Sequence, residues 1–263
     1  MKNKIINQTI RKGVTASALA GLAALLITTA PAVVNAQVIP PDAGLGKAGY
    51  GDLLAKWWQW TLAFPANADP AADTAPQEAN QSGPVWFLAG LHGSEAAGGI
   101  GAVTRQITIP VGTALFFPIL ALENDNTGCP DFTDYTASEL RATLTNEWSA
   151  VTETTCTIDG FAVRRLENPQ SSPFLIQSPV FSYTLASSNN IVAADFGEPC
   201  VPDGITVFPV VAEGVCLLLA PLPPGHHVIH FVGVVGPVSS PFVDFNETYD
   251  VTVAVPHGNG GCK

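Results

Sequence analysis

Runs of β-branched and aromatic residues, separated by proline- and glycine-rich turns, make up most of the chain after residue 80. The most continuous run, residues 227–235, follows the turn LPPG at 222–225. Such side chains fit a pleated, half-buried surface, so this run predicts a central strand. Similar runs predict strands at 85–89, 103–109, 114–120, 156–158, 161–163, 180–185, 206–211, 215–219 and 249–255. Phe116 and Phe117 are adjacent, which predicts a strand covered on both faces.

Two segments show the three- and four-residue spacing of a helix with one buried stripe. In residues 52–62 the stripe consists of Leu54, Trp57, Trp58, Thr61 and Leu62. In residues 137–151 it consists of Leu140, Leu144, Trp148 and Val151, after a capping box formed by Thr136 and Glu139. Many strands with short turns and only two helices predict a mainly β fold. We expect one antiparallel β-sandwich, jelly-roll or immunoglobulin-like, over residues 37–263, with two peripheral α-helices.

The first 36 residues have the pattern of an export signal. A basic start containing Lys2, Lys4, Arg11 and Lys12 precedes an apolar stretch at 14–30 and the small residues Val34-Asn35-Ala36. We expect cleavage after Ala36 and a secreted or periplasmic bacterial protein without stable membrane insertion. An uncleaved anchor at 14–30 is the alternative.

Loss of the signal would leave seven basic and 22 acidic residues, a formal net charge of −15. An acidic protein of this kind repels phosphate backbones and anionic lipid head groups, so we expect no nucleic-acid partner. Charged residues are only 13% of the chain, which indicates a folded protein and not a disordered acidic tail.

All five cysteines follow the predicted cleavage site, where an oxidising compartment favours disulfides. No zinc-binding spacing is present. Cys129 with Cys156 would join the ends of the predicted helical insert, and Cys200 with Cys216 would close a short loop. Cys262 would then remain as a free thiol or an intermolecular link.

Four sequence segments occur in an order that suggests a family. They are WWQW at 57–60, GPVWFLAG at 83–90, IPVGTALFFPI at 109–119 and PLPPGHHVIHFVG at 221–233. The set resembles a family of secreted, uncharacterised bacterial proteins in which the last segment has the form PLxPGxHxIHFxG. The resemblance covers most of the mature chain and implies a shared β-rich fold. It implies no reaction, substrate or cofactor.

Histidines and acidic residues are the first candidates for a functional site. His226 and His230 share one face of the predicted strand but lie about 13 Å apart, which disfavours a shared metal. Glu123, Asp125 and Asp131 lie in an acidic loop whose carboxylates suit calcium, although their spacing is not that of an EF-hand. A solvated loop is the alternative reading.

Tryptophans and one arginine complete the candidates. Trp60 and Trp86 are less clearly core residues than Trp57 and Trp58, and an exposed tryptophan often stacks on a sugar ring. Arg105 lies in a predicted strand, where it would pair with a buried acid such as Glu123 or contact an anion. No G-x-S-x-G nucleophile or G-x-G-x-x-G dinucleotide pattern is present.

Three classes of function follow from these patterns. Export, acidity and Trp-rich segments without a catalytic signature favour a non-catalytic protein that binds a ligand, such as a glycan or cell-surface component. A secreted hydrolase or metal-dependent enzyme would need His92, His230, Glu123 and Arg105 to converge in one pocket. A structural role would use Cys262 as an intermolecular tether.

Overall fold

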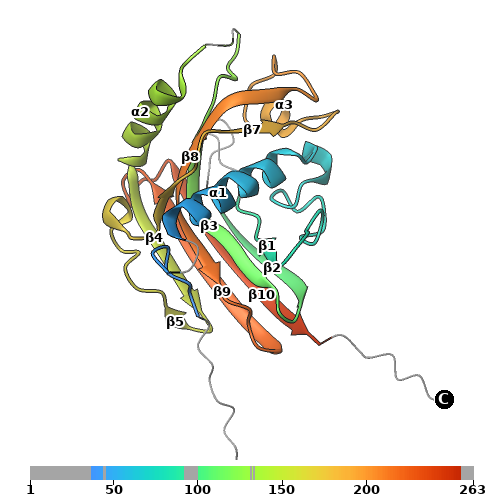
Figure 1. Ribbon diagram of the computed structural model, residues 1–263, viewed down its shortest axis with the longest axis vertical. Coiled ribbons are helices and arrows are strands. Elements are labelled where there is room, and N and C mark those ends of the chain that lie inside the picture. Colours follow the sequence, from blue (N-terminus) through green and yellow to red (C-terminus); the bar gives the residue numbers. More distant parts are fainter. Residues whose placement is uncertain (1–36, 44–45, 92–99, 131, 133, 256–263) are drawn as a thin grey trace, which may run out of the picture. The chain divides into compact units, whose positions relative to one another are not determined.

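A computed structural model describes residues 37–43, 46–91, 100–130, 132 and 134–255. The described chain is mainly β and contains two sheets with helices at their flanks (Figure 1). The helices are α1 (Gly46–Leu62), α2 (Ala137–Trp148) and the short α3 (Ile191–Ala194), with 3-10 turns at Ala66–Ala68 and Pro169–Ser171. This arrangement confirms the predicted β-sandwich with peripheral helices.

The first sheet, called the inner sheet below, has the strand order β1–β3–β8–β6, and β7 also pairs with β8. Its strands are β1 (Val85–Phe87), β3 (Ala114–Asn124), β6 (Leu175–Gln177), β7 (Phe181–Thr184) and β8 (Thr206–Leu219). β1 runs parallel to β3, and the other pairs are antiparallel.

The second sheet, called the outer sheet, has the order β2–β10–β9–β4–β5. Its strands are β2 (Ile100–Pro110), β4 (Val151–Ile158), β5 (Phe161–Ala162), β9 (Gly225–Val235) and β10 (Val243–Ala254). β2 and β10 are parallel, and the remaining pairs are antiparallel. The predicted strand at 227–235 is β9, which lies between β10 and β4 at the centre of this sheet.

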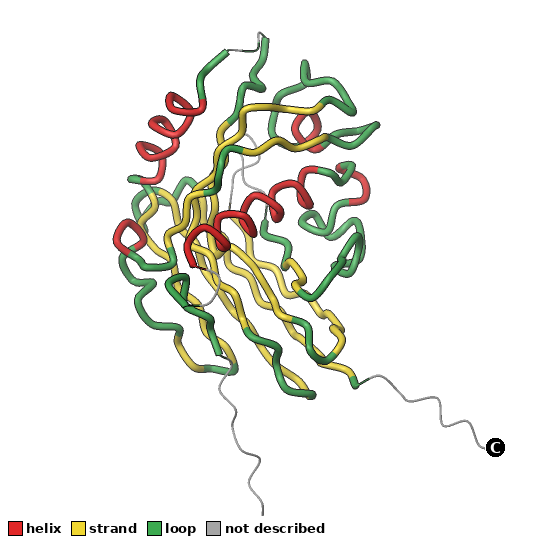
Figure 2. The backbone as a smooth tube through the Cα atoms, in the orientation of Figure 1, coloured by secondary structure: helices red, strands yellow, loops and turns green. Residues whose placement is uncertain are grey.

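Three packed layers result, because the inner sheet is covered on both faces. One face packs under α1 through residues such as Tyr50, Leu54 and Phe116. The other face packs on the outer sheet through residues such as Phe117 and Phe231. Figure 2 shows α1, in red, crossing the yellow strands. α2 adds a smaller contact of Leu140 and Leu144 with Val211 of β8.

The two sheets come closest where β3 crosses β9. A Cβ on Gly233 would lie 2.9 Å from the carbonyl oxygen of Ile119 and 2.9 Å from Leu120 Cβ. A Cβ on Gly214 of β8 would lie 2.8 Å from Ala121 Cβ, beside the irregular register between Pro118 and Leu120 of β3. Gly214 lies inside β8, which runs without a break from Thr206 to Leu219. The two strands predicted at 206–211 and 215–219 are therefore one strand.

The two predicted helices form, with changed ends. α1 begins six residues earlier than the predicted start at 52. α2 has the predicted Thr136–Glu139 capping box but ends at Trp148, so the prediction that Val151 continues its stripe is wrong. Val151 begins β4 and pairs with Val235 of β9, because a β-branched residue followed by several threonines favours a strand.

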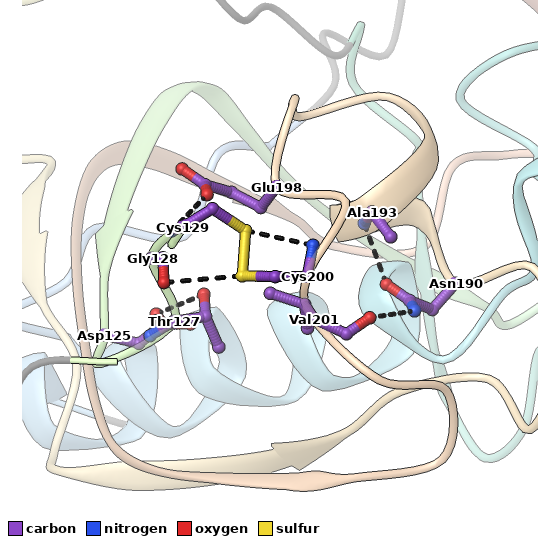
Figure 3. Close-up of a disulfide and its surroundings, with 9 residues drawn as sticks. All are labelled: Asp125, Thr127, Gly128, Cys129, Asn190, Ala193, Glu198, Cys200 and Val201. Carbon is purple, nitrogen blue, oxygen red and sulfur yellow. Dashed lines mark hydrogen bonds between the residues drawn. A yellow bond between two sulfur atoms is a disulfide. The ribbon is translucent and has the colours of Figure 1, made fainter. Parts of the chain in front are cut away.

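The predicted cysteine pairing is also wrong. The structure joins Cys129 to Cys200, with an S–S distance of 2.05 Å (Figure 3). The loop after β3 and the segment before β8 lie at the same end of two antiparallel neighbours, which brings these cysteines together. Cys156 on β4 and Cys216 on β8 are buried free thiols in two different cores. Burial raises the pKa of both thiols.

Several predicted features fall outside the described residues. These are the signal peptide at 1–36, His92, Asp131 and Cys262. In the described part of the chain, none of the helices has the length and apolar character needed to span a membrane.

Candidate functional site

A cavity of about 280 Å³ lies beside the edge of β3, between α1 and the strands β9 and β10. Its walls are mostly apolar and include the aromatic side chains of Trp57, Trp58, Phe196 and Phe245. Two acidic residues, Glu123 of β3 and Glu247 of β10, also line it. Such a volume suits a small molecule and is too small for a long oligosaccharide.

The cavity exists because β1 is short. β1 pairs only with Ala114–Phe116 of β3. The last hydrogen bond between the two segments runs from Leu88 N–H to the Phe116 carbonyl, at 3.1 Å. β3 then continues to Asn124 without this neighbour, and Pro118 suits such an edge because it has no N–H to donate. The chain after β1 turns away and passes the cavity at Gly90 and Leu91.

The two tryptophans of α1 are held differently. Trp57 donates its indole N–H to the Leu88 carbonyl at 2.8 Å, and its ring meets that of Trp58 edge to face at 5.1 Å between centroids. Trp58 is 8% exposed, and its Nε1 has no hydrogen-bond partner among the described residues. A buried donor without a partner costs about 1–3 kcal/mol, and this Nε1 is excluded from solvent although Trp58 lines the cavity.

Glu247 is 1% exposed and is held by two donors. Leu91 N–H donates to its Oε1 at 3.0 Å, and Arg105 Nη1 donates to its Oε2 at 3.3 Å. Burial raises the pKa of Glu247 to about 7, although Arg105 and the Leu91 N–H act in the opposite direction. Glu247 therefore exchanges its proton near neutral pH.

Arg105 is the buried cation behind this wall, and each of its three nitrogens has a hydrogen-bond acceptor. Its Nε lies 2.7 Å from Asp73 Oδ1, and its Nη2 donates to the Ala71 carbonyl at 2.6 Å. Nη1 contacts Tyr249 Oη at 3.2 Å as well as Glu247. The guanidinium thus links two acids.

Glu123 of β3 is the second acid that lines the cavity. Its side chain is half-buried, but its Oε1 is excluded from solvent and has no hydrogen-bond partner among the described residues. Burial raises its pKa well above the usual range, and the nearby Asp125 and Glu147 raise it further. Tyr183 of β7 donates to Asp125 beside it. A hydrogen bond also joins Glu123 to Asp125, so this carboxyl lies among other acids.

The chemistry of the cavity follows from these groups. Its walls offer aromatic and aliphatic surface together with the two acids Glu123 and Glu247. No lysine, arginine or histidine is among the described residues that line it. The site therefore lacks a counter-ion for its acids other than Arg105, which Asp73 shares.

The predicted site residues separate into different places. Glu123 lines the cavity, and Arg105 lies behind it, bound to Asp73 and Glu247 and not to Glu123. His230 lies on the solvent face of the outer sheet and contacts Asn246 Oδ1 at 2.9 Å. In that sheet Arg105 is paired with Tyr249 of β10, and His230 is paired with the preceding residue, Thr248. Because successive residues of a strand point to opposite faces, Arg105 and His230 also point to opposite faces. The convergence required for the predicted His/Glu/Arg pocket does not occur for these residues.

The proposed tryptophan platform is not formed by Trp60. It is 9% exposed and donates its indole N–H to the Ala79 carbonyl at 3.1 Å. Trp86 is half-buried and packs against the core between the sheets. Neither ring lies flat and open on the surface.

The acidic loop does not form a metal centre in the part of the chain that the structure describes, where no group of three His, Cys, Asp or Glu side chains is arranged to hold an ion. Asp125 Oδ1 instead accepts from the backbone and hydroxyl of Thr127 at 2.6 and 2.7 Å. The loop is closed by its own hydrogen bonds and by Tyr183.

The sequence did not identify four of the residues that line the cavity, namely Trp58, Phe196, Phe245 and Glu247. Glu247 had a usable signal, because it shares the inward face of β10 with Tyr249 and Val251, where a charged residue is unusual. The predicted strand began at 249 and so excluded it. Phe196 had no signal, because only the tertiary fold brings the segment after α3 to the cavity.

Comparisons of the chain with protein-family models, with curated proteins and with solved structures gave no significant match in any of the three.

Proposed function

We propose that this protein is an extracytoplasmic binding protein whose β3-edge cavity holds one small, largely apolar molecule. The observation that carries the proposal is an aromatic-walled cavity of about 280 Å³ that two acidic residues, Glu123 and Glu247, also line. Cavities that combine apolar walls with a few placed polar groups are typical of small-molecule sites.

The extracytoplasmic part of the proposal rests on the N-terminal pattern and the Cys129–Cys200 disulfide. Cleavage after Ala36 would leave Gln37 as the first residue, and its carbonyl accepts from Ala220 N–H at 2.9 Å. Ile39 N–H likewise donates to the Leu218 carbonyl at 2.8 Å. The predicted mature chain would thus begin at a residue that the fold holds by a backbone hydrogen bond. N-terminal sequencing of the exported protein tests this, and any start after Ile39 contradicts it.

The binding function is tested by titrating the protein with benzyl alcohol while recording amide NMR spectra. We expect saturable shifts at Gly90, Leu91 and Glu247. Val243→Phe places a ring at the half-buried cavity rim and should abolish them. Val238→Phe is the matched control, because Val238 is 66% exposed in the same hairpin and does not line the cavity. Shifts that survive Val243→Phe, or that occur away from the cavity, would refute the proposal.

Acid–base catalysis is a second candidate, because Glu123 and Glu247 share one cavity and both have raised pKa values. A protonated and an ionised carboxyl in one cavity are suited to general acid and general base roles. Chromogenic esters and glycosides provide the test. Hydrolysis that Glu247→Gln removes and that Asp52→Asn, on the exposed side of α1, leaves unchanged would support an enzyme.

A further inference from the structure

The cavity follows the backbone of one strand over some distance. Six consecutive residues of β3, at 118–123, line it. β1 accompanies β3 only as far as Phe116, and in the described part of the chain no strand pairs with this edge of β3 beyond that point. A strand edge without a neighbour presents backbone N–H and C=O groups with which a further strand can pair. What the cavity offers a ligand therefore depends on which way these backbone groups point.

The hydrogen bonds of β8, the other neighbour of β3, determine that direction. The Ala212 carbonyl accepts from Ser178 N–H at 2.9 Å. Cys216 N–H donates to the Phe174 carbonyl at 3.0 Å. Backbone groups two residues apart on a strand point the same way, so Gly214, which lies between Ala212 and Cys216, shares their direction. All three residues of β8 turn their N–H and C=O groups away from β3, to the side on which β6 lies.

The β3 residues opposite them turn the other way. Glu123 is paired with Ala212, and the pair two residues earlier joins Ala121 to Gly214. Residues directly opposite each other in an antiparallel pair exchange either both of their hydrogen bonds or none. These two pairs exchange none, so the N–H and C=O groups of Ala121 and Glu123 point to the free edge of β3, along which the cavity lies. The Phe116 carbonyl, which accepts the last hydrogen bond from the β1 segment, points to the same edge.

The side walls of the cavity suit the alternation of side chains along a strand. Trp57, Trp58 and Phe196 belong to the packing on the α1 face of the inner sheet. Val235 and Val243 belong to the packing between the two sheets. Successive side chains of a strand point to opposite faces, so a strand laid along β3 would place alternate side chains against each wall. Both walls are apolar, which favours apolar side chains at both sets of positions.

Size and charge restrict such a strand further. An extended chain rises about 3.3 Å per residue, so the β3 residues that line the cavity span about 17 Å. The volume of about 280 Å³ has room for only a few side chains, so the ligand is short. Glu123 and Glu247 line the cavity, and none of the described residues around it is a lysine, arginine or histidine. A free carboxylate would meet like charge there, so an internal segment of a chain fits better than a carboxyl terminus.

We infer that the β3-edge cavity binds a short, extended, apolar peptide segment, which pairs as an added strand with the backbone of Ala121 and Glu123. This inference rests on the proposed binding function and names the ligand class of that same cavity. Strand addition obtains affinity from main-chain hydrogen bonds and selectivity from the pockets that receive alternate side chains. It also continues an arrangement that the fold already uses, because β1 occupies the first part of the same edge.

Calorimetric titration with three capped peptides tests the inference. The probe is acetyl-Val-Phe-Val-amide, and two analogues carry N-methyl groups, one on the central residue and the other on both valines. N-methylation removes N–H donors and keeps every side chain. Because only alternate N–H groups of a strand face a given neighbour, we expect one analogue to bind at least about tenfold more weakly than the probe and the other to bind within about threefold of it. Val243→Phe should abolish binding of the probe, and Val238→Phe should leave it unchanged.

Amide hydrogen exchange of the native protein shows which backbone groups the probe contacts. The amides of Ala121 and Glu123 should exchange at least about tenfold more slowly at saturating acetyl-Val-Phe-Val-amide, because they lose contact with water and gain acceptors. Leu122 is the matched control, because it is paired with Glu213 and by the same alternation bonds to β8 with or without the probe. If the Ala121 and Glu123 amides were as protected as that of Leu122 before the probe is added, the edge would already be paired and the inference would be wrong.

The outcomes separate the ligand class from the binding function. Equal affinity for all three peptides would overturn strand addition and leave cavity binding intact. Absence of binding by acetyl-Val-Phe-Val-amide would also overturn the inference, and the benzyl alcohol titration would then decide the binding function on its own. Binding that slows exchange on another strand but not at Ala121 and Glu123 would show that the peptide adds to a different edge, which contradicts the assignment.

Discussion

Phe116 and Phe117 are neighbours in sequence, yet their side chains belong to two different cores. Phe116 meets Tyr50 of the N-terminal segment of α1 edge to face, at 6.0 Å between ring centroids. Phe117 stacks on Phe231 of the outer sheet at 4.9 Å. β3 therefore connects both cores, and its free edge is where the cavity opens. Changes that move β3 should affect packing and binding together.

Gly233 of β9 and Gly101 of β2 both pair with Phe245 of β10, from its two sides. Substitution of each glycine by alanine therefore gives a variant and its matched control. Gly233→Ala should destabilise the protein by about 1–3 kcal/mol, because its Cβ would lie 2.9 Å from the Ile119 carbonyl oxygen. Gly101→Ala should have little effect, since its Cβ would meet only Leu91 at 3.5 Å. Denaturant unfolding measures both. Equal losses would contradict the close approach of the two sheets.

Arg105→Met should cost about 3–5 kcal/mol of unfolding free energy, because it leaves Glu247 buried without a cation. Adding Glu247→Gln should recover a substantial part of the loss, since the uncompensated acid is then removed. Chemical denaturation of the single and double variants gives the coupling free energy between Arg105 and Glu247. Arg164→Met, at an exposed position, is the control for loss of an arginine. Additive losses would argue against the ion pair.

Stability should fall as pH rises from about 4.5 to about 7, because the pKa of Glu247 is raised from 4.5 in the unfolded chain to about 7 in the folded protein. Folding favours the protonated form of Glu247. Its contribution to the free energy of unfolding is therefore fully present below pH 4.5 and is lost above about pH 7. The loss in the free energy of unfolding over this range is about 3 kcal/mol. Unfolding midpoints across this range should fall less in Glu247→Gln than in the native protein. Part of the slope should persist in that variant, because Glu123 acts in the same direction. An unchanged slope would contradict the burial of Glu247.

Replacing Cys129 and Cys200 together by serine should lower stability by about 4 kcal/mol, because the disulfide closes a loop with a sequence separation of 71 residues. Thermal unfolding measures the loss. A change below about 1 kcal/mol would indicate that this pair is not joined in solution.

Cys156 and Cys216 should resist thiol reagents in the folded protein, because they are 2% and 0% exposed and burial raises the pKa of each thiol. A Cys262→Ser background isolates them for labelling. Both should react fully in guanidinium chloride, and rapid labelling in native buffer would refute their burial.

The fold was predictable where local pattern and tertiary packing agree. The stripe with Trp57 and Trp58 predicted α1, and the apolar run at 227–235 predicted β9 at the centre of a sheet. β6, with three residues, carries too little pattern to be recognised. The parallel pairing of β2 with β10 joins segments at opposite ends of the chain, and no local signal specifies that choice.

The site was less predictable, because its residues come together only through tertiary structure. Glu123 was identified because it follows a strongly apolar run, and an acid there is unusual. The disulfide partner of Cys129 could not be found from spacing, since it depends on which strands become neighbours. Histidines attracted attention through their chemistry, yet His227 binds Asp159 and the Pro223 carbonyl, at 2.8 and 2.9 Å. Its role is to hold a turn.

The three-residue length of β1 has an evolutionary consequence. Because β3 loses its partner after Phe116, adding or removing a residue or two after Phe87 would resize the hollow, and it would also shift Leu88 and Ala89, which are buried in the two cores. Variants of this scaffold could thus shift from one ligand size to another by changing the length of a single loop. A β1 extended alongside Pro118 would seal the hollow, and such a protein would retain the sandwich while losing the capacity to hold a guest.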